Sequence, residues 1–180
     1  AEKLCGLLPQ GACLVEYVRY GSRAEAAGDS LSRPVLTDGA FVIRAGNAQP
    51  VWVRIGPAAR TDSLIDRYRA RVANPIDPLF FQEVARDLYD HVWTPIEPWV
   101  RDGDPVLVVP EGPLHLVAFG TLVTPAGEYL VERKAVHLLT ASRDLLRLSR
   151  PGALGEGLLA LGDPDYDLAA ERRARVLEEL

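Results

Sequence analysis

The stretch VLVVP at residues 106–110 decides the fold class, because it is an uninterrupted apolar run bounded on each side by turn residues. Such a run is typical of a strand buried on both faces, as in a parallel sheet that helices cover. LLALG at residues 158–162 is a second run of this kind. Between the two, SRDLLRLSR at residues 142–150 predicts a short helix capped by Ser142. Strand, helix and strand in this order predict an α/β architecture.

Upstream of this region the sequence predicts an antiparallel part of the sheet. The alternating, β-branched pattern of residues 12–20 predicts a strand, and the polar residues 21–38 predict a loop. FVIRA at residues 41–45 and VWVRI at residues 51–55 predict two short strands. The turn residues Gly46-Asn47 lie between them, so a hairpin is expected.

Two helices are expected between this hairpin and residue 106. From Thr61 the apolar residues repeat with helical spacing, and Asn74-Pro75 ends that pattern. Asp77 as N-cap and Pro78 at the first helical position predict the start of the second helix.

The remaining segments complete the expected organisation. Residues 114–119 and 129–139 predict strand or hairpin, and a helical pattern runs to Leu180. We expect a strand-rich region over residues 1–60, followed over residues 61–180 by the helical pair and the α/β region, within one continuous globular unit.

Composition excludes several classes of protein. The 180 residues include 20 basic and 25 acidic side chains, so the formal net charge of −5 offers no basic face for nucleic acid. No apolar run reaches 18 residues, which predicts no membrane partner. Two cysteines and no signal-peptide pattern favour a reducing, cytoplasmic location. The sequence contains no methionine, so we expect the chain to be a piece of a longer gene product.

The histidines and cysteines form no complete catalytic or metal-binding motif. The sequence has neither Cys-x-x-Cys nor His-x-x-x-His, so no metal and no cofactor is predicted. Cys13 lies in a strand pattern and is expected to be a buried, inert thiol. We expect His91 at a surface or boundary position and His137 in the core. A Cys–His pair that uses Cys13 stays open as an alternative.

The turn after VLVVP is a structural motif in this interpretation. His115 follows Glu111-Gly112-Pro113. We expect Glu111 and His115 to hold a hairpin together by hydrogen bonds across the Gly112 turn, and His115 not to act in catalysis.

Asp163 and Asp165 follow the run LLALG directly. Two carboxylates after a buried strand could hold Mg²⁺ for phosphoryl transfer, with Lys134 as the candidate phosphate-binding lysine. The competing interpretation is a turn in which Pro164 fixes the bend. A magnesium-dependent phosphotransferase is therefore an alternative function.

Seven segments together resemble the CHAT domain, a caspase-like peptidase domain often found behind tetratricopeptide repeats. The resemblance runs from about Leu8 to Asp167, and VVPEGPLHLVAFGTL followed by YLVERKAV is its most specific part. Glu111 stands where the family usually has Asp, and Val117-Ala118 stand where it usually has Leu-Pro. The segments are LLPQGACLVEYVRY, FVIRAG, VWVRIGPAARTDSLIDRYR, LYDHVWTPIEPWV, VLVVPEGPLHLVAFGTL, YLVERKAVHLLTAS and LLALGDPDYD.

The resemblance implies a fold and a reaction. The expected fold is a caspase-like sandwich with a largely parallel sheet flanked by helices, preceded by an antiparallel strand and hairpin region. The expected reaction is amide hydrolysis, in which a histidine helps to form the thiolate that attacks the scissile carbonyl of a protein substrate.

The resemblance also implies that the catalytic dyad lies elsewhere. In the family the catalytic histidine and cysteine follow the GDPDY segment, so neither maps onto a residue of this chain, and His115 does not match the family's catalytic histidine. The expected partner is a complementary carboxyl-terminal polypeptide that carries the dyad, with tetratricopeptide repeats upstream as another implied partner. A catalytically silent interaction module that shares the fold is the alternative.

Overall fold

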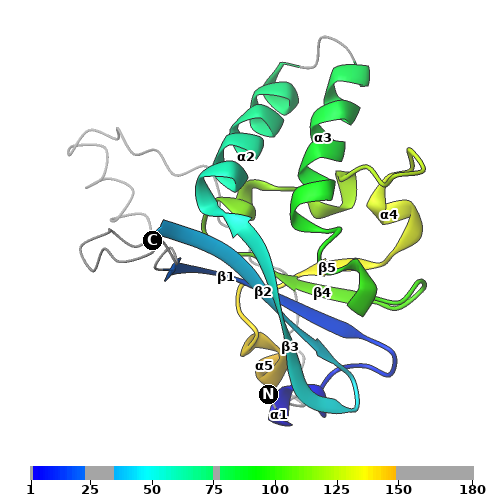
Figure 1. Cartoon of the computed structure of the whole chain (residues 1–180). Helices are drawn as coiled ribbons and strands as arrows, with labels where there is room; N and C mark the ends of the chain where they lie inside the picture. Colours follow the sequence, from blue (N-terminus) through cyan, green and yellow to red (C-terminus); the bar gives the residue numbers. More distant parts are fainter. Residues whose placement is uncertain (1, 23–34, 75–77, 149–180) are drawn as a thin grey trace, which may run out of the picture. The chain divides into compact units, whose positions relative to one another are not determined.

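The computed structural model of the chain describes residues 2–22, 35–74 and 78–148 (Figure 1). Asp77, the run LLALG, Asp163, Asp165 and the expected last helix lie outside these residues. The elements are α1 (Glu2–Cys5), β1 (Cys13–Ser22), β2 (Val35–Arg44), β3 (Asn47–Pro57), α2 (Ala58–Ala73), α3 (Pro78–Val92), η1 (Glu97–Trp99), β4 (Val106–Val109), η2 (Gly112–Leu116), η3 (Phe119–Thr121), α4 (Leu130–Arg133), β5 (Val136–Leu138) and α5 (Asp144–Leu148).

A five-stranded mixed sheet in the order β3-β2-β1-β4-β5 organises the fold. β1, β2 and β3 are antiparallel neighbours, whereas β4 runs parallel to β1 and β5 runs parallel to β4. The α/β fold expected from the sequence is confirmed, with its antiparallel hairpin on one side and its parallel strands on the other. The sheet is consistent with part of a caspase-like domain.

The hairpin between β2 and β3 forms because Gly46 can take a left-handed conformation. Its φ is 77°, and Arg44 pairs with Asn47 directly across the turn. Both strands are longer than the apolar patterns alone predict. β2 begins at Val35, and β3 extends from Asn47 to Pro57. The prediction of a loop over residues 21–38 is therefore wrong at both ends, since Gly21 and Ser22 belong to β1 and residues 35–38 belong to β2.

The core lies mainly between the sheet and the helical pair. Alternate residues of β1, among them Val15 and Tyr17, face α2 and α3, which lie side by side on one face of the sheet (Figure 1). Tyr17 is 1% exposed, and its hydroxyl donates to the carbonyl of Val92 at 2.9 Å. The other face of the sheet is covered at one end by a smaller cluster that includes Leu14, Leu107 and Leu145.

β4 confirms the interpretation of VLVVP as a doubly covered strand. All four of its residues are buried, and Leu107 belongs to one cluster while Val106 and Val108 belong to the other. A strand with apolar neighbours on both faces needs apolar side chains at every position, which explains the uninterrupted run.

The hairpin expected over residues 114–139 is wrong. Two 3₁₀ turns, η2 and η3, and the short helix α4 occupy this segment, and only Val136–Leu138 form a strand. Pro113 near the start of η2 favours a turn of helix, since its φ is fixed and it donates no hydrogen bond. The carboxylate of Glu132 accepts from the backbone N–H of Tyr129 at 2.6 Å and fixes the start of α4.

α5 forms where a helix was predicted, but Ser142 does not cap it with its side chain. The Ser142 hydroxyl lies 3.2 Å from Oε1 of Glu16 in β1 and donates to that carboxylate. The carboxylate of Asp144 instead accepts from the N–H of Ala141. The Ser142 contact ties the segment after β5 to the middle of the sheet.

Candidate functional site

The carboxyl end of β4 is the end at which an α/β sheet places a ligand. Glu111, Gly112 and His115 follow β4 there, and Gly112 takes a positive φ of 53° that lets the chain turn directly into η2. Glu111 and His115 are exposed. Within the ranges that the structure describes, neither side chain makes a hydrogen bond, so the two residues share this edge but are not hydrogen-bonded to each other.

The other two histidines differ from their sequence-based interpretation. His91 was expected near the surface but is only 7% exposed, and its Nε2 lies 3.0 Å from Oγ1 of the fully buried Thr61. Burial lowers the pKa of His91, and the nearby Arg60 lowers it further. His137 was expected in the core but is exposed on the edge strand β5. Both errors arise because helix and strand periodicity do not show which face another element covers.

The thiol of Cys13 is placed for packing and not for attack. Its side chain is fully buried at the start of β1, and burial raises its pKa to about 11. The charged groups that act on this thiol are Arg44, Asp104 and Lys134, and no histidine is among them. The predicted burial of Cys13 is therefore confirmed. Cys5 lies in α1 and is partly exposed.

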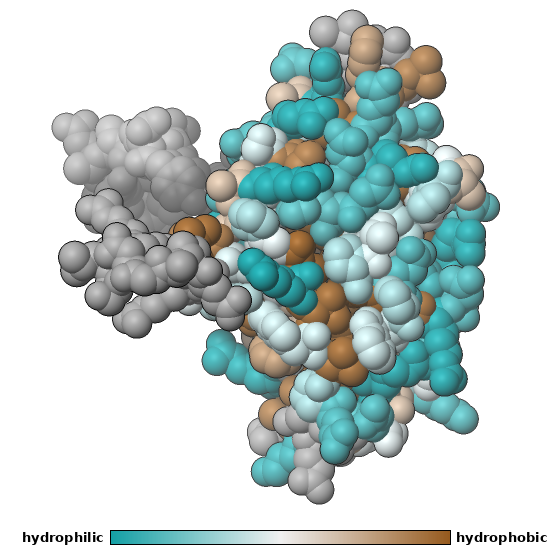
Figure 2. Space-filling view, viewed as in Figure 1, coloured by the Kyte–Doolittle hydropathy of each residue, from teal (hydrophilic) through white to brown (hydrophobic). Residues whose placement is uncertain are grey.

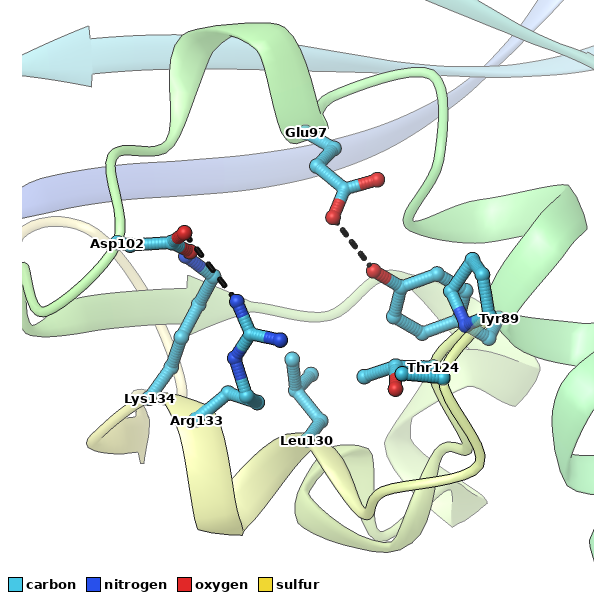
Figure 3. Close-up of a pocket in the computed structure, with 9 residues that line it drawn as sticks. Tyr89, Glu97, Asp102, Thr124, Leu130, Arg133 and Lys134 are labelled. Atoms are coloured by element: carbon cyan, nitrogen blue, oxygen red, sulfur yellow. Dashed lines mark hydrogen bonds and ion pairs between the residues drawn. The ribbon is translucent and has the colours of Figure 1, made fainter.

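A cavity of about 200 Å³ lies at the opposite end of the parallel strands (Figure 3). Asp102 precedes β4 and Lys134 precedes β5, so the cavity is at the amino ends of these strands. Figure 3 shows Lys134 and Arg133 pointing toward Asp102, and Tyr89 pointing toward Glu97. The complete lining is Tyr89, Glu97, Asp102, Thr124, Pro125, Ala126, Leu130, Arg133 and Lys134.

The side chain of Lys134 is buried in the wall of this cavity and is hydrogen-bonded to two groups. Its side chain is 3% exposed, and its Nζ donates to the carbonyl of Arg101 at 3.1 Å and to Oδ1 of Asp102 at 2.9 Å. The hydrogen bond from Lys134 lowers the pKa of Asp102, as do the charges of Lys134 and Arg133. Lys134 therefore joins the segments that precede β4 and β5, and its ammonium is already paired with Asp102.

Sequence reasoning missed an ion-pair cluster between the sheet and α2. Nε of Arg19 lies 2.8 Å from Oδ1 of Asp38, and its Nη2 lies 2.7 Å from Oδ1 of Asp62. These hydrogen bonds raise the pKa of Arg19. The three residues come from β1, β2 and α2, so no spacing in the sequence relates them. The cluster orients α2 on the sheet.

Asp163 and Asp165 lie outside the described residues, so their geometry is not part of the site. Across residues 2–22, 35–74 and 78–148, no three metal-ligating side chains come together. Over the same residues, no helix is long and apolar enough to span a bilayer.

The sequence of this chain matches a known protein family. Residues 82–180 match the CHAT domain, which is more than half of the chain. The match begins in α3 and includes β4, the turn at Glu111-Gly112 and β5. A search of curated proteins found no match. The chain therefore belongs to the CHAT domain family, a family of caspase-like peptidases.

Proposed function

We propose that this chain is the amino-terminal scaffold of a CHAT cysteine endopeptidase. Its partner is a complementary carboxyl-terminal polypeptide that carries the catalytic histidine and cysteine, and its substrate is a protein. The proposed location is the cytoplasm, where thiols stay reduced.

The state of Cys13 carries this proposal. A cysteine nucleophile reacts as a thiolate, and catalytic cysteines have a pKa at or below neutral pH beside a histidine or another positive group. Cys13 is fully buried with a pKa of about 11. With its pKa raised this far, the thiol stays protonated at neutral pH. A peptidase of this family therefore needs a different cysteine.

The sheet supports a scaffold role. β4 and β5 are parallel, and within the described part of the chain β5 pairs with β4 alone, so its other edge offers free backbone groups. A further parallel strand could extend the sheet at this edge. The carboxyl end of that strand would then lie beside the turn at Glu111 and His115, where α/β sheets place their reacting groups.

The chemistry assigned to the complex is amide hydrolysis. The histidine of the partner would accept the thiol proton, the thiolate would attack the scissile carbonyl, and water would hydrolyse the resulting acyl-enzyme. The residues of this chain hold the sheet edge and the 3₁₀ turns that border the reacting groups. They take no part in proton transfer.

Co-expression with the polypeptide encoded directly downstream tests the proposal. The complex is expected to hydrolyse fluorescein-labelled casein and to contain one thiol that is alkylated rapidly at pH 6, whereas the 180-residue chain alone does neither. Cys5→Ala and Cys13→Ala should leave hydrolysis by the folded complex unchanged.

Two results would overturn the assignment. Hydrolysis by the chain alone, lost in Cys5→Ala or Cys13→Ala, would place the nucleophile in this chain. A stable complex with no hydrolysis and no reactive thiol would indicate the silent interaction module instead.

A further inference from the structure

A groove of about 350 Å³ lies between the second half of α2 and the 3₁₀ turns that follow β4. Its walls come from two segments that are more than forty positions apart in the sequence. α2 contributes Tyr68, Arg69, Val72 and Ala73, and the segment from η2 to η3 contributes Leu116 and Ala118.

The walls of this groove are apolar and open to water. Val72 is 55% exposed and Leu116 is 52% exposed. Figure 2 shows a largely hydrophilic face with separate hydrophobic areas, one of them at the top of the view near the start of α3. An apolar side chain held between Val72 and Leu116 would remove these surfaces from water.

The floor of the groove is preorganised. The hydroxyl of Tyr68 lies 2.8 Å from Oγ1 of Thr121, and its ring packs against Phe81 with centroids 5.6 Å apart. Tyr68 is only 3% exposed. A ligand would therefore enter a pocket whose base does not need to rearrange, which lowers the entropic cost of binding.

Arg69 lines the groove and forms no ion pair with the described residues. Between Arg67 and Asn74, α2 carries three arginines and no acidic residue. Arg67 pairs with Asp87 at 3.1 Å, and the guanidinium of Arg71 lies 5.2 Å from the centre of the Phe80 ring. Arg69 makes no ion pair and no hydrogen bond with the residues that the structure describes, and it is the one charged residue among those that line the groove.

We propose that this groove docks a short segment of a partner protein in which an apolar side chain stands beside an acidic one. The apolar side chain enters between Val72 and Leu116, and the carboxylate binds Arg69. Charge complementarity selects this occupant, since a guanidinium at the rim of an apolar pocket favours a carboxylate. One arginine in this groove, on a chain with net charge −5, does not suit nucleic acid, whose binding requires several phosphate contacts. The proposal does not depend on peptidase activity.

Fluorescence anisotropy with the purified 180-residue chain tests this docking site. The probe is a fluorescein-labelled octapeptide with one leucine flanked by two glutamates in a Gly-Ser background. Two matched peptides replace the leucine by serine or both glutamates by lysine. Saturable binding of the probe is expected, at least tenfold tighter than that of either matched peptide.

Variants of the exposed lining residues locate the binding. Arg69→Glu and Leu116→Ser should each weaken probe binding at least tenfold, while circular dichroism and thermal melting show an intact fold. Arg60→Glu on the same helix and Val131→Ser on α4 change residues that are also exposed but lie outside the groove, and they should leave the affinity unchanged. Absence of saturable binding at millimolar probe, equal binding of the lysine peptide, or unchanged affinity in Arg69→Glu would overturn the proposal.

Discussion

Nε2 of His91, near the end of α3, lies 3.0 Å from Oγ1 of Thr61 in the first turns of α2, and both side chains are buried. This contact joins the two helices close to the sheet. Gly56 of β3 approaches the same imidazole, since a Cβ placed on it would lie 3.3 Å from Cε1 of His91. The ring is thus enclosed by three elements.

Acid should weaken the fold through His91. Burial lowers its pKa below 6.5, and Arg60 opposes protonation while Asp38 partly favours it. Below about pH 6.5 the unfolded chain binds a proton that the folded chain excludes, so the free energy of unfolding falls as pH falls. Relative to His91→Gln, which does not titrate, the wild type should lose up to about 1.4 kcal/mol per pH unit. Urea unfolding at pH 7.5, 6.5 and 5.5 measures this, and parallel pH profiles of the two proteins would contradict it.

Gly39 provides room for the indole of Trp52. A Cβ on Gly39 would lie 2.2 Å from Cη2 of Trp52, whose ring also packs on Phe41 at 4.7 Å between centroids. Gly39→Ala should push the ring away and destabilise the fold by about 1 kcal/mol. In a Trp52→Ala background the same change should stabilise the strand by about 0.5 kcal/mol, because glycine is unfavourable in strands. A double-mutant cycle of unfolding free energies measures the coupling, and additive effects would rule out the steric explanation.

Lys134 should contribute more to stability than its neighbour Arg133. Lys134 is 3% exposed and binds a backbone carbonyl as well as Asp102, whereas the side chain of Arg133 is 41% exposed. Lys134→Met should reduce the free energy of unfolding by about 1–2 kcal/mol, because the Arg101 carbonyl loses its buried donor. Arg133→Met should have a clearly smaller effect, because its ion pairs are exposed to solvent. Equal effects in chemical denaturation would show that burial does not distinguish the two residues.

The two thiols should differ in reactivity. Cys13 is fully buried with a pKa of about 11, whereas Cys5 is partly exposed. At pH 8 in native buffer, a disulfide reagent such as DTNB should titrate at most one thiol per chain within minutes, and two in denaturant. Cys5→Ala should then show no fast reaction. Rapid labelling of the native Cys5→Ala variant would show that Cys13 is accessible.

His115→Ala should leave the fold intact. Its side chain is exposed and makes no hydrogen bond within the described residues, so the free energy of unfolding should change by less than about 0.5 kcal/mol. Thermal and urea unfolding measure this, with His91→Ala as the buried comparison. A loss above about 1 kcal/mol would restore the structural role expected from the sequence.

Much of the architecture followed from local patterns. The run at residues 106–110 predicted a strand with apolar neighbours on both faces, and β4 is buried at all four positions. Periodicity and turn residues located β1, the β2–β3 hairpin, α2 and α3, because these signals depend on side-chain alternation and on residues a few positions apart. The buried state of Cys13 followed for the same reason.

The segment after β4 depended on tertiary packing. Leu114, Val117, Phe119 and Leu122 are all buried, and successive 3₁₀ turns present them to one core. The same apolar letters suit a strand, and only the position of α2 and α3 above them decides between the two. For the same reason the sequence placed His91 outside and His137 inside, whereas the packed elements do the reverse.

The sequence by itself determined the fold class and the family resemblance, since these rest on residue types and on spacings along the chain. Only the tertiary structure decided which charges meet. The ion pairs join elements that are distant in the sequence, namely Arg19 with Asp38 and Asp62, and Lys134 with Asp102. The groove between Val72 and Leu116 likewise lies between two distant segments. The energy of such contacts depends on separation and burial in space, and neither quantity is a property of local sequence.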